Sequence, residues 1–162
     1  MNILKHTEYV KKLLTEKPHL RDDDCKLISN VWHKELLLKG IDSRKITAFE
    51  FMKMFSAIIS DCNQYRYLLS RVWDESKPLI MFMMLNPSTA DADIDDPTIR
   101  RCIGFAKSWD YGGIYVGNLF AFRATIPKDL ILQIDPIGKH NIFYLKTMEA
   151  KCEGVVYSWG NS

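Results

Sequence analysis

The feature that most constrains the fold is a near-continuous apolar run over residues 79–85, followed directly by Asn86 and Pro87. A strand that is apolar at successive positions is typical of a sheet covered on both faces, because each face then needs apolar side chains. The stretch from Pro78 to Pro87 is shorter than the ~18 uncharged apolar residues of a membrane helix. The run therefore predicts a buried strand of an α/β domain, and no membrane segment.

Strand and helix patterns alternate after this point. Asp96 and Pro97 form a helix start, with the aspartate as N-cap and the proline at the first helical position. We expect strands over residues 65–73, 79–85, 114–120 and 154–158, and helices over residues 96–109, 125–133 and 135–151. Alternation of this kind predicts a parallel sheet with right-handed crossovers. Residues 63–162 are thus expected to form a three-layer α/β domain.

The first 60 residues carry helical patterns instead. Pro18 ends a first helix, Gly40 ends a second, and a capping box from Thr47 to Glu50 opens a third helix that includes Ile58. We expect a small all-α bundle over residues 1–60 that serves structure or interaction. A helix-turn-helix is the alternative, although a DNA-reading helix needs Arg, Asn or Gln at its exposed front.

Composition excludes several classes of protein. The net charge of +2 does not by itself imply a nucleic-acid partner. The four cysteines and four histidines are scattered, without metal or redox spacing. We therefore expect free thiols, a cytoplasmic location, no metal site and no cofactor. Charge throughout residues 1–12 argues against a secretory signal.

Ligand sites of open α/β sheets lie beyond the carboxyl ends of the strands, so the loop 86–96 is the first candidate. Asn86 offers an amide that both donates and accepts, and Ser88 and Asp91 follow it. We interpret Asn86 and Asp91 as candidate catalytic residues and Ser88 as substrate-binding. The alternative is a turn in which Asn86 and Ser88 satisfy the local backbone.

The loop is also acidic, with aspartates at 91, 93, 95 and 96. The loop does not match a calcium-binding loop, which needs Gly at its sixth position and Glu at its twelfth. Counted from Asp91, these positions hold Asp96 and Cys102. A magnesium-dependent nuclease or phosphohydrolase using Asp91, Asp95 or Asp96 remains an alternative. Otherwise Asp96 caps a helix and the other acids face water.

Further candidates lie nearby. Arg100 and Arg101, in the first turns of the helix, would bind a phosphate or pair with the preceding acids. Asn118 is polar inside an apolar strand, so its burial requires a partner, and its amide matches a nucleobase edge. The candidate substrate-binding side chains at the second and third strand ends are Asn118, Phe120, Arg123 and Trp159.

Five motifs occur in order: MLNPSTAD, DDPTIRRC, GNLFAFRAT, DPIG followed by HN, and WGN. Together with the opening YRYLLSRVW they resemble the bacterial and phage family called domain of unknown function 1643. The resemblance covers about residues 65–162.

A weaker resemblance is to the uracil-DNA glycosylase superfamily, carried by LNPS, GNLFAFRAT and WGN. It implies a glycosylase-like fold that binds DNA or a nucleotide and flips a base out of the stack. By this resemblance Asn86 would position a water near the sugar C1′, and Asn118 would bind the base edge. Any activity would then be a hydrolase reaction of the DNA-glycosylase type, with Asp91 as a carboxylate beside an oxocarbenium-like centre.

The sequence departs from both families after WGN, where they continue with a helix, a strand and a His-Pro element. We therefore expect an α/β domain that is incomplete at its C-terminus, with its last strand as an exposed edge. Such an edge would allow homo-oligomers. The alternative function is accordingly a non-catalytic interaction module.

Overall fold

The computed structural model describes residues 56–88, 90–126 and 128–159. The predicted helical bundle lies outside these residues, apart from its last positions. Those positions differ from the prediction, because Ile58 belongs to the strand β1 (Ala57–Ile59) and pairs with Leu68. The third helix therefore does not extend over Ile58.

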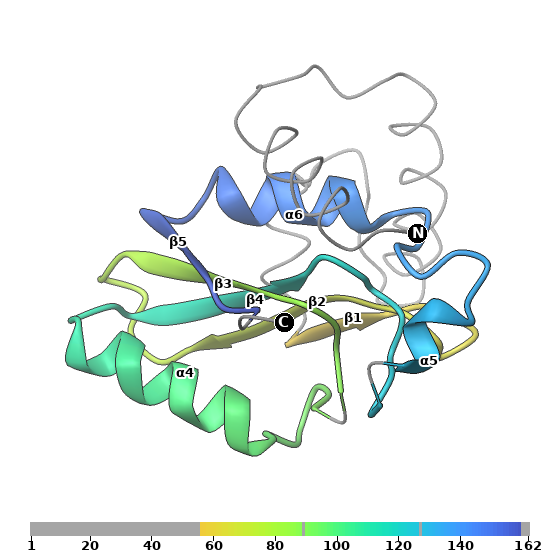
Figure 1. The fold of residues 1–162 in the computed structure, drawn as a ribbon. Helices are drawn as coiled ribbons and strands as arrows, with labels where there is room; N and C mark the ends of the chain where they lie inside the picture. Colours follow the sequence, from red (N-terminus) through yellow and green to blue (C-terminus); the bar gives the residue numbers. More distant parts are fainter. Residues whose placement is uncertain (1–55, 89, 127, 160–162) are drawn as a thin grey trace.

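The described residues form a five-stranded sheet in the order β1-β2-β4-β3-β5 (Figure 1). Its other strands are β2 (Arg66–Val72), β3 (Leu79–Met84), β4 (Gly113–Asn118) and β5 (Gly154–Tyr157). All four lie within two residues of the predicted strands. β3 runs parallel to β4 and β5 on its two sides.

The prediction of a fully parallel sheet is wrong, because β2 is antiparallel to β4 and β1 is antiparallel to β2. Only residues 73–78 connect β2 to β3. A parallel crossover needs a dozen or more residues, so β3 has to run opposite to β2. The domain is an α/β domain with a mixed sheet.

Helix α4 (Pro97–Ser108) lies on one face of the sheet and α6 (Asn141–Glu149) on the other (Figure 1). Asp96 caps α4 as predicted, accepting a hydrogen bond from the backbone N of Ile99. α6 begins later than predicted, because the Asp135 side chain accepts from Gly138 N and residues 135–138 form a turn. Gly138 has φ +81, a conformation that favours glycine. The predicted helix over 125–133 is the short α5 (Lys128–Ile131).

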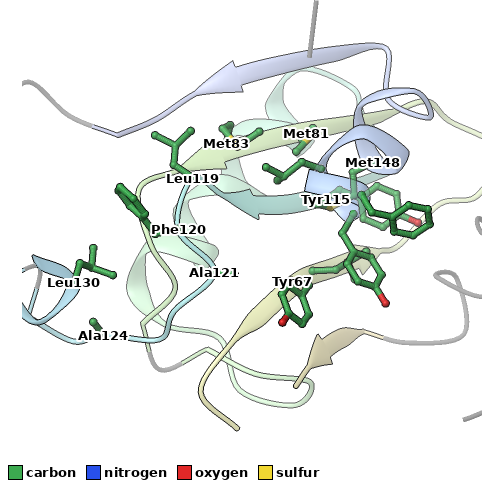
Figure 2. Close-up of a cluster of buried hydrophobic side chains, with 14 residues drawn as sticks. Tyr67, Met81, Met83, Tyr115, Leu119, Phe120, Ala121, Ala124, Leu130 and Met148 are labelled. Atoms are coloured by element: carbon green, nitrogen blue, oxygen red, sulfur yellow. The ribbon is translucent and has the colours of Figure 1, made fainter. Parts of the chain in front are cut away.

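Each face of the sheet carries its own apolar cluster. The α6-side cluster joins Met81 of β3, Tyr115 of β4 and Met148 of α6, which lie together (Figure 2). The α4-side cluster joins sheet residues such as Phe82 to the buried side of α4. In the described part of the chain, no helix is long and apolar enough to span a membrane.

Candidate functional site

The carboxyl ends of β3 and β4 lie side by side, as the site prediction requires. Met84 is the register partner of Asn118, and beyond the strands Leu119 N donates to Met84 O at 2.9 Å. Asn86, two residues past Met84, therefore leaves the sheet at the same edge as Asn118. The loop 86–96 starts from this edge and leads into α4.

Asn118 is 1% exposed and hydrogen-bonded at one end of its amide only. Its Oδ1 accepts from Arg66 Nη2 at 3.2 Å. Its Nδ2 is buried and has no hydrogen-bond partner among the described residues. The predicted pairing of this buried amide is thus present for the oxygen, while the nitrogen is a buried N–H donor without an acceptor.

Arg66, at the start of β2, is the partner that the sequence did not predict. It is 2% exposed, and its Nη1 donates to Ala90 O at 2.7 Å, so it ties the loop 86–96 to the sheet. Its Nε also lacks a hydrogen-bond partner within the described residues. No ion pair between Arg66 and a carboxylate is found in that part of the chain.

A β-bulge accounts for this burial. Ile58 pairs with Leu68 while Ile59 pairs with Arg66, so Tyr67 is an extra residue on β2. Tyr67 and Leu68 consequently both join the α6-side cluster, and Arg66 contacts the loop leading to α4. Burial lowers the pKa of Arg66 to about 10, opposed by the nearby charges of Asp96 and Asp91. The guanidinium stays charged at neutral pH.

Asn141, the first residue of α6, supports the same strand end. Its Nδ2 donates to the backbone oxygens of Asn118 at 2.8 Å and Leu119 at 3.2 Å. Its Oδ1 is buried without a partner among the described residues. The motif HN was noticed in the sequence, but nothing there showed which backbone groups its amide would reach.

Asn86 is half-buried and holds the loop to the segment that follows β4. Its Nδ2 donates to Ala124 O at 2.7 Å and to Pro87 O at 3.2 Å, and Ala124 N donates back to Pro87 O. The amide nitrogen of Asn86 therefore satisfies backbone carbonyls, as the alternative interpretation of this turn expected. Ser88 is half-buried and follows the buried Pro87.

The acidic side chains of the loop are engaged locally. Asp91 Oδ1 accepts from the backbone N of Asp93 and of Ile94, both at 3.0 Å, and these bonds lower the pKa of Asp91. Asp95 forms an ion pair with Arg71 at 2.8 Å, and Asp96 caps α4. No cluster of three or more His, Cys, Asp or Glu that could hold a metal occurs in residues 56–88, 90–126 and 128–159.

The two aromatic residues predicted to bind substrate lie in or against the α6-side cluster. Phe120 is 2% exposed inside the α6-side cluster, and the half-buried Trp159 packs against that cluster and meets Tyr157 edge to face. The Phe120 ring is thus a core side chain and offers no free face for a base. Asn118 lies on the other side of the sheet, because it alternates with Val116 and Ile114 of the α4-side cluster.

The three predicted phosphate- or substrate-binding arginines lie in two different places. Arg123 is half-buried and close enough for its charge to lower the pKa of both Arg66 and Asp91. Arg100 and Arg101 are exposed on α4, and Arg100 Nη1 donates to Asp95 O. The structure therefore brings together Asn118, Arg66, Arg123 and the loop 86–96.

Comparisons with known proteins give one match. The model of the family described as "Protein of unknown function (DUF1643)" matches residues 66–162. Neither the search of curated proteins nor the search of solved structures gave a match.

Proposed function

The chain belongs to the DUF1643 family, and we propose that its α/β domain recognises a nucleobase or nucleotide at the carboxyl ends of β3 and β4. The observation that carries this proposal is the buried Asn118 Nδ2, which has no acceptor among the described residues. A buried donor left unpaired costs about 1–3 kcal/mol. A ligand that brings an acceptor atom offsets this cost, and nucleobase edges present such atoms.

The surroundings of Asn118 support binding at this place. Ligands of α/β sheets bind beyond the carboxyl ends of strands, and Asn118 is the last residue of β4. Arg66 and Arg71 hold the adjoining loop through Ala90 O, Asp91 O and the Asp95 carboxylate. Residues 90–95 are thus held in place before a ligand arrives, which reduces the entropy lost on binding.

The finer proposal is hydrolysis of an N-glycosidic bond. Asn86 would position a water through its amide oxygen while its nitrogen stays fixed by Ala124 O. Asp91 would supply the negative charge that an oxocarbenium-like centre requires, because a carboxylate is ionised at neutral pH and the bonds from Asp93 N and Ile94 N lower the pKa of Asp91 further. Arg123 is the candidate contact for a phosphate, and its charge already acts on Asp91.

The recognition proposal is tested by titrating nucleosides and short single strands into the full chain by calorimetry. We expect Asn118→Ala to weaken binding at least roughly tenfold, the loss of one good hydrogen bond, with thermal melting showing that the variant folds. The matched control is Asn63→Gly, since Asn63 is exposed and has φ 58, which glycine tolerates. Equal affinities of wild type and Asn118→Ala contradict the proposal.

Hydrolysis is tested separately by base release from uracil-containing and modified single strands. Asp91→Asn keeps an oxygen that accepts from Asp93 N and Ile94 N but removes the charge. We expect release to fall at least roughly tenfold with the melting temperature nearly unchanged. An absence of release by wild type leaves recognition as the function.

One observation favours an alternative function as an interaction module. β5 stands at the end of the sheet order within the described residues and pairs with β3. The outer side of such a strand can pair with a second copy of the chain. Light scattering across a concentration series tests this, and a constant monomer mass rules out self-association.

A further inference from the structure

Three buried polar atoms near the end of β4 lack a partner among the described residues, and two of them belong to the hydrogen-bonded pair of Arg66 and Asn118, whereas the third is Asn141 Oδ1. Asn118 Nδ2 and Arg66 Nε are both N–H donors, and both are buried without an acceptor among the described residues. The acceptor end of the Asn118 amide is already taken by Arg66 Nη2 at 3.2 Å. A ligand reaching this pair therefore meets two donors, and not the donor–acceptor edge of a free amide.

The two donors are neighbours, because their side chains are joined by that hydrogen bond. In a guanidinium, Nε and Nη2 lie along the same edge, which is the edge that binds planar two-acceptor groups. Arg66 Nη2 donates to Asn118 Oδ1. The donors without an acceptor are therefore Arg66 Nε, on the same edge of the guanidinium, and Asn118 Nδ2. The positive charge of Arg66 also favours a ligand that presents acceptor atoms, since no described carboxylate forms an ion pair with Arg66.

We propose that Arg66 is a specificity-determining residue, which orients Asn118 so that the pair selects ligand edges composed of acceptors. On a purine this is the O6–N7 edge of guanine, whereas adenine places its N6 amino group beside N7. The inference rests on the proposed function and names its substrate class: bases with adjacent acceptors. Uracil fits less well, because its N3–H stands between its two carbonyl oxygens.

Arg66 also has a second role that the test has to separate. Its Nη1 holds Ala90 O, so replacing it also loosens the loop. Arg71 holds the same loop through Asp91 O and Asp95 without contacting Asn118. Arg71→Lys therefore loosens the loop and the Arg71 bonds to Ser56 O and Ser70 O, but leaves the partner of Asn118 in place. Arg66→Lys also removes the planar fork that fixes the Asn118 amide.

The experiment titrates the full chain with guanosine, 7-deazaguanosine, adenosine and inorganic phosphate. We expect wild type to bind guanosine roughly tenfold more tightly than adenosine, as one well-placed pair of acceptors allows. 7-Deazaguanosine, which lacks the N7 acceptor, should bind more weakly than guanosine. This ligand comparison uses wild type, so it stays informative if Arg66→Lys fails to fold. Arg66→Lys should reduce the guanosine preference, and Arg71→Lys should retain it.

The outcomes separate this inference from the function on which it rests. Equal affinity for guanosine and adenosine, or a preference for adenosine, overturns the selectivity and leaves nucleobase recognition standing. Phosphate binding that Arg66→Lys abolishes, without binding of any nucleoside, keeps the acceptor-selective pair and refutes nucleobase recognition. Binding of none of the four probes overturns this inference, and nucleobase recognition is then decided by the titrations with pyrimidine nucleosides and short single strands.

Discussion

At the scale of single residues, three buried polar side chains join segments that are far apart in the sequence. Arg66, Asn118 and Asn141 come from β2, β4 and α6, and their contacts link the loop 86–96 to the end of β4. The sequence predicted that Asn118 needs a partner. It could not predict Arg66, 52 positions away, because that contact depends on β2 lying antiparallel beside β4 and on the bulge at Tyr67.

Asn141→Leu should destabilise the protein by about 2–4 kcal/mol, because the change removes the donor that two buried backbone oxygens share. Urea denaturation followed by tryptophan fluorescence measures the loss. Gln133→Leu is the control, since its side chain is only half-buried in the loop after α5. A loss below about 0.5 kcal/mol would show that water satisfies these oxygens equally well.

The described cysteines should differ strongly in thiol reactivity. Cys62 is exposed, and a hydrogen bond with Ser60 lowers its pKa, whereas burial raises the pKa of Cys102 to about 11 and that of Cys152 to about 12. The thiolate is the reactive form, so Cys62 should be alkylated by iodoacetamide at pH 8 at least roughly tenfold faster than the other two. Peptide mapping by mass spectrometry follows each site separately, and urea should abolish the difference.

At the scale of elements, the sequence predicted a helix or strand correctly where the deciding side chains belong to that same element or its cap. The N-cap Asp96, Pro97 and the apolar run of β3 each determined an element within one or two residues. The orientation of β2 was missed, because a strand pattern carries no direction. The start of α6 was missed because Asp135 and Pro136 are compatible with a helix start, while the Asp135 bond to Gly138 N makes a turn there.

Asp96→Ala should cost about 1 kcal/mol, the usual contribution of an N-cap side chain. Asp96→Asn should cost less, because its amide oxygen still accepts from Ile99 N. The two variants, compared by urea denaturation, separate the cap from the charge that Asp96 places near Arg66. If both variants lose the same stability, the charge and not the cap is what matters.

At the scale of the whole molecule, one sheet separates two cores, which explains why β3 is apolar at every position. Met81 and Met83 face the α6-side cluster, while Ile80, Phe82 and Met84 face the α4-side cluster. This two-sided burial was predictable from the residues 79–85 alone. The edge at β1 was not predictable, because β1 lies in a segment whose pattern suggested a helix.

Both cores contain weak acids that the fold keeps protonated, so the whole molecule should lose stability at alkaline pH. Burial raises the pKa of Cys102 in the α4-side cluster from 9.0 to about 11, and that of Tyr115 in the α6-side cluster from 10.0 to about 12. Cys152 beside the same cluster is raised from 9.0 to about 12. Above pH 9 the unfolded chain releases these protons first, so it binds fewer protons than the folded chain and the free energy of unfolding falls.

The stabilisation from these groups is complete below pH 9 and is lost as the pH rises toward 11–12, through the folded pKa values. By pH 10 each of the two thiols should have lost about 1 kcal/mol of its contribution. Urea unfolding at pH 7, 8, 9, 10 and 10.5, with a reductant present, measures the decline. Cys102→Ala combined with Cys152→Ala should make it shallower, because alanine has no proton to lose. A free energy of unfolding that stays constant from pH 7 to 10.5 would mean that the two thiols and Tyr115 reach solvent in the folded protein and ionise there as they do in the unfolded chain.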